Sequence, residues 1–351
     1  MTIRLGSVVG IALSLTLAIV HGAMAASFTG QTLRVQQWPT GPEAEALKKY
    51  VIDPFIKETG ANIVVEYGHT TASIAKIRAQ KDDPQLDVVL LDDIGVYTLA
   101  REGLLDQLDL SKLENAKYIF PNYVLANSHG IGVTTYIATI LYNTKLMATA
   151  PTSWNDLWDP KYKGKVVLPP ANVARAPLLA LMAAKLNGGG IDNMAPAWPK
   201  LQELKPNVYS FLENRALSAE DFRSGQAAMT IDLVAFWKPY VEKGVPVAMA
   251  GDLKEGFFAF TGAASLVKGG KGNRELAYAF IDKVLSAEAQ RGFAEDNWFG
   301  PTNRNVKVSL EAAKYMAVTP EQVARAIPLD QLKMLDLRPE IIKQWNTIFV
   351  H

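Results

Sequence analysis

The amino-acid sequence predicts an α/β protein of two units, each a mostly parallel β-sheet flanked by helices, and three observations support this fold class. The chain has 351 residues, enough for two domains at roughly 150 residues each. Short apolar segments alternate with segments whose apolar residues recur every three or four positions, as in alternating strands and helices. Residues 86–91 are apolar apart from Asp87 and show no alternation of polar and apolar residues, as in a parallel strand buried on both faces.

The first unit is expected near the start of the chain. Pro54 lies inside its first helix and is expected to kink or break it, and Gly60 is placed to end it. The expected elements, in order, are a strand over 33–38, a helix over 44–55, a strand over 62–67, a helix over 73–80 and a strand over 86–91.

The second unit is expected from residue 165 onward. Three consecutive glycines, at 188–190, end its first helix. The helical ending of the chain is amphipathic and is expected to pack onto a domain. The expected elements are strands over 165–168, 208–212, 227–231 and 262–267, helices over 176–186, 219–225 and 274–292, and the helical ending over 321–345.

The composition excludes several classes of function. Lys and Arg number 36 against 35 Asp and Glu, a net charge of +1, so no broad basic field for nucleic acid or anionic lipid is expected. Hydrophobic residues make up 49% and charged residues 20%, as in a globular protein. The chain contains no cysteine, which excludes disulfides, thiolate metal sites and cysteine nucleophiles.

Residues 1–25 are predicted to be a cleaved secretory signal. Arg4 precedes an uninterrupted run of apolar and small residues over 5–20, which is shorter than the roughly 20 residues that span a membrane. The run is followed by Ala23-Met24-Ala25, a small-x-small cleavage pattern. We therefore expect a periplasmic protein that begins at Ala26 and has no stable membrane insertion; a retained anchor is the alternative.

No sequence motif argues for catalysis, a cofactor or a metal. The sequence has no G-x-S-x-G elbow, no G-x-x-x-x-G-K-[ST] phosphate loop, no H-E-x-x-H pair and no EF-hand loop. The adjacent carboxylates Asp92 and Asp93 point in different directions and do not by themselves make an acid/base pair. We therefore expect no enzyme; the alternative is a secreted enzyme that uses one of these two residues as a general base.

One long motif is distinctive. Residues 151–166 read PTSWNDLWDPKYKGKV, and shorter segments support it: LRV at 33–35 with Trp38, FIKETG at 55–60, LDVV at 86–89, EGLL at 102–105, LKPNV at 204–208 and ELAYAFI at 275–281. In these motifs, from about Leu33 to Asn303, the sequence resembles the extracellular solute-binding proteins of ABC importers, in the spermidine/putrescine-binding-like branch. Within the long motif, Trp154, Leu157 and Trp158 follow helical spacing and are interpreted as core residues under a helix capped by Ser153.

The resemblance implies a type II clamshell of two lobes with the solute in the cleft between them. Lobe 1 is expected over 26–133 with 262–302, and lobe 2 over 134–261 with 303–351. The chain would cross between the lobes near 132–136, 261–262 and 301–302. The implied partners are a small-molecule solute and the membrane permease subunits of the importer, and a monomer is expected. A ligand sensor for a membrane receptor is the alternative, since it reads the same closed form.

The resemblance also implies site residues, and two of them depart from the polyamine pattern. Polyamine-binding members use aromatic and acidic side chains, and Trp38, Asp92 and Asp93 agree with this. Arg175 stands where those members carry acidic residues. Those members also carry an aromatic residue and an acid before the strand at 263–267. This sequence has Phe260, Thr261 and Gly262 there, so the aromatic residue is present and the acid is absent. An arginine at position 175 repels a diamine and suits a carboxylate or phosphonate.

Five further candidates lie at predicted strand ends or crossings. Thr70 and Thr71 open a helix and serve either as ligands of a polar group or as an ordinary N-cap. Asp232 ends a strand and is expected in the cleft. Tyr136 lies beside a crossing and is either a core residue or a cleft wall, as is Trp298.

Acids on one side and Arg175 on the other favour a zwitterionic or partly anionic organic solute, with a simple polyamine as the alternative. Arg215 belongs either to the cleft or to a solvated face, and the solvated face is favoured. Ferric iron, bound by some relatives, is disfavoured because its usual ligands are neighbouring tyrosines and no Tyr-Tyr pair occurs.

Overall fold

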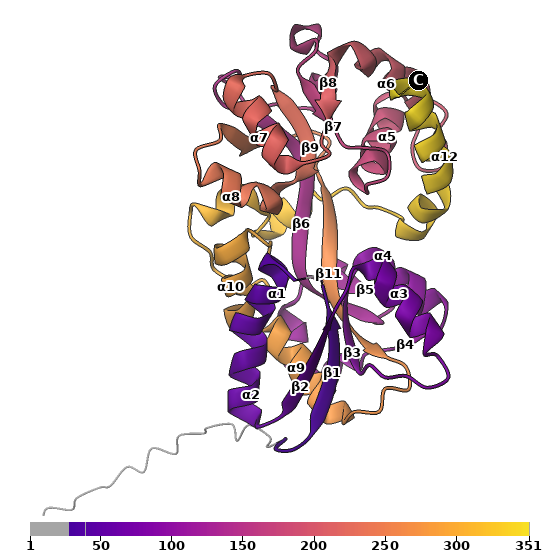
Figure 1. Cartoon of the computed structure of the whole chain (residues 1–351), viewed down its shortest axis with the longest axis vertical. Helices are drawn as coiled ribbons and strands as arrows, with labels where there is room; N and C mark the ends of the chain where they lie inside the picture. Colours follow the sequence, from indigo (N-terminus) through magenta and orange to yellow (C-terminus); the bar gives the residue numbers. More distant parts are fainter. Residues whose placement is uncertain (1–27, 39, 351) are drawn as a thin grey trace, which may run out of the picture.

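The described chain forms two lobes that lie one above the other in Figure 1. The computed structural model describes residues 28–38 and 40–350, so the predicted signal segment 1–25 and its cleavage site lie outside the described residues. Each lobe contains parallel strands that pair with an antiparallel crossing strand, and helices flank the sheet. The predicted two-lobed α/β fold is confirmed.

The described strands form one sheet that passes through both lobes, in the order β2-β1-β3-β11-β6-β9-β7-β8. β1 is parallel to β2 and β3, and β7 is parallel to β8 and β9. The strands are β1 (Thr32–Gln37), β2 (Asn62–Tyr67), β3 (Val88–Asp92), β4 (Leu105–Asp106), β5 (Val124–Leu125), β6 (Gly130–Asn143), β7 (Val166–Leu168), β8 (Val208–Phe211), β9 (Met229–Leu233), β10 (Val247–Met249) and β11 (Phe258–Val267).

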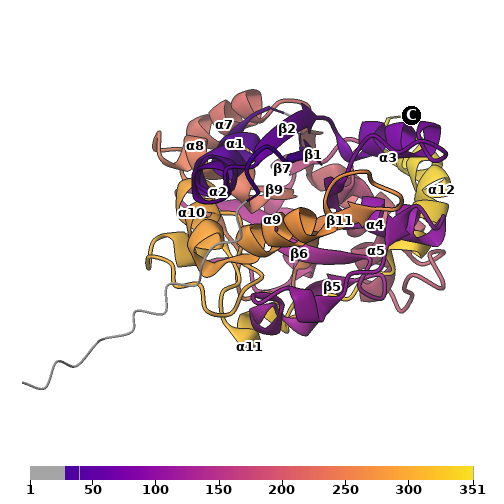
Figure 2. The ribbon, with the colours of Figure 1, turned by 90° about the horizontal axis from the view of Figure 1, so that it is seen from below.

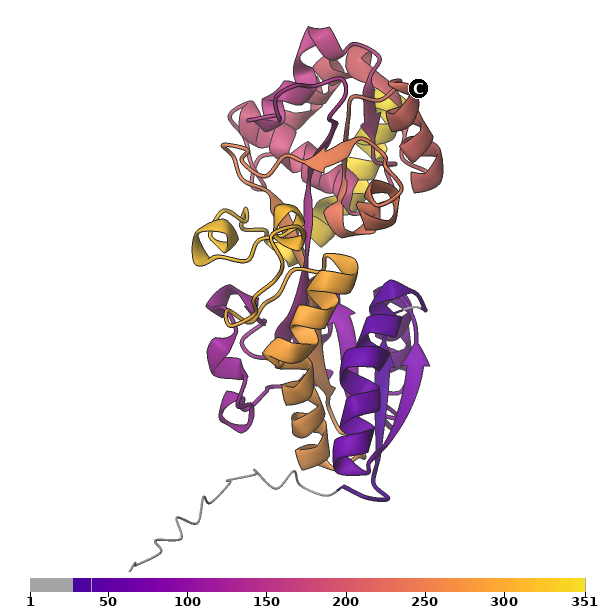
Figure 3. The ribbon, with the colours of Figure 1, turned by 90° about the vertical axis from the view of Figure 1, so that its left-hand side faces the viewer.

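Two long antiparallel strands, β6 and β11, join the lobes (Figures 1 and 3). The lower half of β11 pairs with β3, while the upper half of β6 pairs with β9. Their mutual register shifts between Gly262 and Ala263, opposite Thr134 and Gly132. This shift in register lies at the crossings predicted near 132–136 and 261–262. The division of the chain into lobe 1 (26–133 with 262–302) and lobe 2 (134–261 with 303–351) stays a prediction.

Helices cover both faces of the sheet. In the lower lobe, α1, α2, α9 and α10 lie side by side on one face, and α3 and α4 cover the other (Figures 1 and 2). The helices are α1 (Pro42–Leu47), a π-helical turn (Lys48–Ile52), α2 (Asp53–Thr59), α3 (Thr70–Ala79), α4 (Asp93–Arg101), α5 (Arg175–Leu186), α6 (Ala197–Leu204), α7 (Arg215–Ser224), α8 (Lys238–Val241), α9 (Arg274–Leu285), α10 (Ala287–Asn297), α11 (Pro320–Val323) and α12 (Gln331–Phe349). Among residues 28–38 and 40–350, no helix has the length and apolar character needed to span a membrane.

The first predicted helix has the expected irregularities. Pro54 lies inside a helical stretch that continues from α1 to α2, and the π-helical turn directly before α2 accommodates the proline, which has no N–H to donate. Gly60 ends α2 in the left-handed conformation, with φ at 71°.

Two long helical predictions were wrong. The segment predicted as one helix over 274–292 is divided at Ser286, whose extended backbone ends α9 and whose hydroxyl accepts a hydrogen bond from the Ala289 N–H of α10. The predicted ending over 321–345 consists of α11 and α12, separated by an irregular stretch that includes Pro328.

The distinctive motif at 151–166 belongs to the core of the upper lobe. Trp154 and Leu157 are fully buried, and the Trp154 ring packs edge-on against Phe258 with 5.7 Å between centroids. Ser153 caps the short 3-10 helix that carries them. The core interpretation is confirmed for Trp154 and Leu157, while Trp158 is partly buried and packs against the same core.

Candidate functional site

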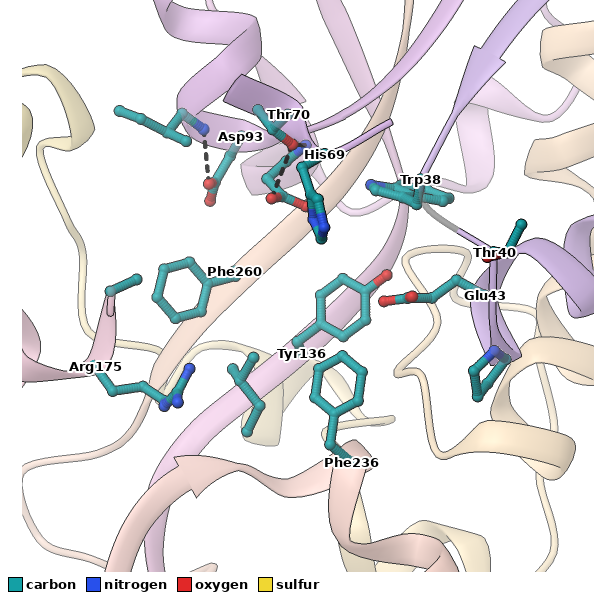
Figure 4. A pocket seen from close by; sticks show the side chains of 15 residues that line it. Trp38, Thr40, Glu43, His69, Thr70, Asp93, Tyr136, Arg175, Phe236 and Phe260 are labelled. Carbon is teal, nitrogen blue, oxygen red and sulfur yellow. Dashed lines mark hydrogen bonds between the residues drawn. The ribbon is translucent and has the colours of Figure 1, made fainter. Parts of the chain in front are cut away.

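A cavity of about 460 Å³ lies between the two lobes (Figure 4). The lower lobe contributes the ends of β1 and β3 and the first turns of α1, α3 and α4, and the upper lobe contributes the start of α5 and the end of β9. Open α/β sheets bind ligands at such carboxyl ends of strands. We call this the cleft cavity. It is lined by Trp38, Thr40, Pro42, Glu43, His69, Thr70, Asp92, Asp93, Ile94, Tyr136, Ala174, Arg175, Leu233, Phe236 and Phe260.

Asp92, the last residue of β3, is held by the start of α3. The Thr70 hydroxyl donates a hydrogen bond of 2.9 Å to Asp92 Oδ2 and accepts one of 3.2 Å from the Asp92 N–H. Burial raises the pKa of Asp92, and the hydrogen bond from Thr70 opposes the rise. A cationic group in the cavity would stabilise the ionised form of this carboxyl group.

Asp93 begins α4, and protein donors occupy its carboxylate. The Ile94 N–H donates to Oδ1 at 2.8 Å, while the Thr261 N–H at 3.2 Å and Gln331 Nε2 at 2.9 Å donate to Oδ2. Burial raises the pKa of Asp93 to about 7, and the neighbouring Asp92 carboxylate adds to the rise. Because Gln331 begins α12, Asp93 links α4 to the C-terminal helix.

Glu43, in the first turn of α1, is a third acid on the lower-lobe side of the cavity. Burial raises the pKa of Glu43 to about 7, and the Asp92 carboxylate adds to the rise. The Tyr136 hydroxyl points toward the Glu43 carboxylate (Figure 4). Burial raises the pKa of Tyr136 well above its ordinary value, so this hydroxyl remains a neutral donor.

A buried carboxylate holds two arginines on the opposite side. Asp232 is 0% exposed and accepts hydrogen bonds from Arg215 Nε at 2.6 Å and from Trp237 Nε1 at 2.8 Å. Arg175 Nε lies 2.8 Å from Asp232 Oδ1. Two guanidinium groups thus share one carboxylate, which leaves one positive charge in excess. Arg175 lines the cleft cavity, and Arg215 lies over the Phe236 ring at 4.8 Å.

Trp38 forms an aromatic wall beside the acids. Its side chain is buried, and its indole Nε1 has no hydrogen-bond partner among the described residues. The ring packs against Gly262, where an added Cβ would lie 2.7 Å from Trp38 Cζ2. The absence of a side chain at Gly262 therefore makes room for this indole.

A second aromatic wall joins the cavity to the crossing strands. Tyr136 of β6 stacks parallel to Phe236 with 6.2 Å between ring centroids and meets Phe299 edge-on at 5.2 Å. Aromatic faces suit the methylene chain or the cationic end of an organic solute. The cleft cavity therefore combines apolar walls with acids on one side and a guanidinium on the other.

Comparison with known proteins identifies the family. The model of the family described as bacterial extracellular solute-binding protein matches residues 50–320, more than half of the chain. The chain belongs to this family. The resemblance found in the sequence motifs is therefore confirmed.

Three relatives show how far the similarity extends. A spermidine/putrescine-binding periplasmic protein of Haemophilus influenzae is 29% identical over 212 residues, 58% of this chain and 57% of that protein. A gamma-aminobutyric acid-binding protein of Pseudomonas aeruginosa is 24% identical over 325 residues, 87% of this chain and 84% of that protein. The structure of an ABC transporter protein from Clostridium perfringens superposes with a TM-score of 0.79 at 26% identity, covering 90% of this chain and 99% of that one.

Most of the site residues predicted for this solute-binding protein lie in the cavity wall. The seven that line it are Trp38, Thr70, Asp92, Asp93, Tyr136, Arg175 and Phe260. They come from both lobes and from the crossing strands, and they share one property: each lies at a strand end, at a helix start or on a crossing strand. The prediction from strand ends therefore brought together residues that are distant in sequence.

Three predicted site residues lie outside the cavity wall. Thr71 is exposed on α3, because neighbours on a helix point about 100° apart and Thr70 faces the cavity. Thr261 faces away from the cavity because it follows Phe260 on a strand. Asp232 is buried behind the arginines that it holds. In addition, the N-cap of α3 is His69, so neither threonine has the alternative capping role.

Other predictions need correction at individual residues. Arg215 does not belong to a solvated face; its guanidinium pairs with Asp232 and covers Phe236. Of the two alternatives for Trp298, the structure agrees with a core residue: Trp298 is buried, stacks on Tyr315 with 3.6 Å between ring centroids and does not line the cavity. Within the described residues, no group of three or more His, Asp or Glu is arranged to hold a metal ion.

Glu43 and Phe236 were missed by the sequence analysis. The signal for Glu43 was its place in the first helical turn after the first strand, next to Pro42, which is where cleft residues are expected. Phe236 carried no such signal, because it reaches the cavity through a 3-10 helix that follows β9.

Proposed function

We propose that this solute-binding protein is the periplasmic substrate-binding subunit of an ABC importer, and that it captures a small zwitterionic organic solute whose ammonium and carboxylate groups stand apart. The observation that carries the proposal is the distribution of charge in one aromatic-lined cavity. Glu43 and Asp92 lie on the lower-lobe side, and Arg175 lies on the upper-lobe side.

Each charged end of the solute has a partner. The ammonium group pairs with Glu43 and Asp92 and lies against Trp38 and Tyr136, because a cation in a site shielded from water needs carboxylates or aromatic faces. Asp93 contributes less, since its carboxylate already accepts hydrogen bonds from three protein donors. The carboxylate group pairs with Arg175, which Asp232 holds in place.

The relatives support both a zwitterion and a polyamine. The Pseudomonas aeruginosa relative is named for gamma-aminobutyric acid, which carries one ammonium and one carboxylate group. The Haemophilus influenzae relative is named for spermidine and putrescine, and the acids of the cleft cavity favour that second candidate. Arg175 opposes it: at about 6 Å and an effective dielectric constant near 20, repulsion between a guanidinium and an ammonium amounts to roughly 3 kcal/mol.

Import requires further steps outside this chain. The solute stabilises the closed clamshell, and the membrane permease subunits recognise that form. The protein acts as a periplasmic monomer after removal of residues 1–25, and it needs no cofactor and catalyses no reaction. A membrane receptor that recognises the same closed form is the second candidate partner.

Thermal-shift screening of the mature protein tests the proposal. The panel contains 4-aminobutyrate and longer ω-amino acids, aminoalkylphosphonates, putrescine and spermidine. A ligand at 100 times its Kd raises the free energy of unfolding by about 2.7 kcal/mol. Zwitterions are expected to shift the melting temperature more than polyamines.

Calorimetry with Arg175→Ala then separates the two candidates. Zwitterion binding is expected to weaken by about 10- to 100-fold, because a charge-assisted pair is lost. Putrescine binding is expected to strengthen, because a repulsive charge is removed. Micromolar binding of putrescine that Arg175→Ala leaves unchanged would contradict the assignment of a zwitterion.

A further inference from the structure

A second, smaller cavity adjoins the cleft cavity beneath the C-terminal helix α12. Its volume is about 70 Å³, and we call it the annex. The annex and the cleft cavity share three lining residues, Ile94, Ala174 and Phe260. A group that is attached to a solute in the cleft cavity therefore reaches the annex past these side chains.

The rest of the annex wall is mostly apolar. Pro177 and Leu178 come from α5, Met334 and Leu335 come from α12, and Leu329 comes just before that helix. The wall is therefore built by the upper lobe and the C-terminal helix, with Ile94 of α4 as the contribution of the lower lobe.

The two polar residues of the annex are engaged with other groups. Gln331 Nε2 donates to Asp93 Oδ2 at 2.9 Å, and Arg338 Nη2 donates to the Asn172 carbonyl at 2.5 Å. A polar substituent that moved into the annex would lose its hydration without a matching set of partners, whereas an apolar substituent would lose nothing.

We propose that the annex is a second subsite, which takes a short alkyl branch of the solute while the charged ends stay in the cleft cavity. The inference rests on the proposed function and narrows it to zwitterions that carry an apolar branch. A dry cavity of about 150 Å³ holds benzene, so a cavity about half that size fits a branch of about three carbon atoms.

Calorimetry on the mature protein tests the annex with a matched set of compounds. The parent is 4-aminobutyrate, and its derivatives carry methyl, ethyl, propyl or butyl groups on carbon 2, on carbon 3 or on the nitrogen. Burial of each methylene group is expected to improve the affinity about fourfold. In at least one series, the gain is expected to continue to propyl and to stop at butyl.

Variants of α12 connect that gain to the annex. Leu335→Phe is expected to fill the annex from a partly exposed position, so that the branched compounds lose their advantage while the Kd of the parent is unchanged. Leu332→Phe is the matched control, because Leu332 lies on the same helix and does not line the annex. Met334→Ala enlarges the annex and is expected to move the best branch length beyond propyl.

The outcomes separate the two proposals. The annex is not a subsite if 4-aminobutyrate binds but none of its alkylated series binds more tightly. The annex is also not a subsite if the alkylated compounds keep their higher affinity in Leu335→Phe and Met334→Ala leaves the best alkyl length unchanged. If the wild-type protein binds neither the parent nor any derivative, the proposed zwitterion function is wrong, and the inference fails with it.

Discussion

Asp92 and Asp93 are neighbours in sequence, but their carboxylates have different surroundings. Asp93 accepts hydrogen bonds from Ile94, Thr261 and Gln331, so the protein itself stabilises the position of this side chain. Asp92 accepts a side-chain hydrogen bond from Thr70. A carboxylate whose acceptor sites are occupied contributes less to a ligand than one that is open, so the acids available to an ammonium group are Asp92 and Glu43.

Glu43 makes the affinity for a cationic group depend on pH. Because burial raises the pKa of Glu43 to about 7, only about a tenth of the side chains are ionised at pH 6 and about nine tenths at pH 8. The affinity for a solute with an ammonium group is therefore expected to rise up to about tenfold between pH 6 and pH 8. Glu43→Gln is expected to weaken binding at pH 8 and to flatten this dependence, as measured by calorimetry; an unchanged pH profile in the variant would remove Glu43 from the site.

Gly262 lies too close to its neighbours to carry a side chain without a shift of Trp38 or Thr134. A Cβ at this position would lie 2.7 Å from Trp38 Cζ2 and 2.9 Å from Thr134 Cγ2. Any side chain at 262 therefore collides with the indole that forms the cavity wall.

Gly262→Ala is expected to displace the Trp38 ring, to change its fluorescence and to weaken solute binding by about tenfold. Gly190→Ala is the control, because an added Cβ at Gly190 meets nothing within 4 Å. Equal affinities for the wild-type protein and Gly262→Ala would show that the Trp38 wall tolerates the shift.

The strands were predicted better than the helices, and the reasons are local. A segment such as 86–91, which is apolar apart from Asp87, predicts a buried strand, because few other structures bury every residue of so short a run. The break at Ser286 was not predicted, because apolar residues continue at helical spacing on both sides of it. A capping serine interrupts a helix through its backbone conformation, which the apolar pattern does not record.

The capping role of Ser286 has a measurable energy. Ser286→Ala removes the hydroxyl that accepts the Ala289 N–H at 3.2 Å and is expected to cost about 1 kcal/mol. The melting temperature is then expected to fall by about 2–4 °C. Ser286→Asp keeps an N-cap acceptor and is the control; if both variants melt together, the hydroxyl does not act as a cap.

The site was predicted where position along a strand determined it and missed where packing determined it. Trp38 and Asp92 follow strands whose carboxyl ends meet at one edge, and their place in the cavity follows from that topology. Arg215 lies beside the site because it pairs with Asp232 and covers Phe236, which lines the cavity. Such a position depends on contacts between elements, and no spacing in the sequence reports them.

Stability of the unliganded protein is expected to fall as the pH rises. Burial raises the pKa of Asp93 to about 7, so the folded protein keeps a proton that the unfolded chain releases near pH 4. Because the folded state binds more protons, the contribution of this group is complete below about pH 4 and is lost as the pH rises through 7. Between pH 5.5 and pH 8 the loss is about 2 kcal/mol for Asp93.

Urea unfolding at several pH values measures this dependence. Asp93→Asn carries no titrating proton and is expected to show a smaller loss of stability between pH 5.5 and pH 8. A wild-type free energy of unfolding that increases over this range would contradict the assignment of a protonated carboxyl group to the folded cleft.

The pairing of β11 with β3 also bears on how the chain folds. Thr261 of β11 and Asp93, next to β3, stand 168 positions apart in sequence and meet in the folded sheet. The lower lobe therefore lacks a central strand until most of the polypeptide has been synthesised, and contacts of such long range form slowly. The lower lobe is therefore expected to acquire its native packing only after β11 has left the ribosome, so that release of the nearly complete chain sets the earliest time at which this lobe can fold.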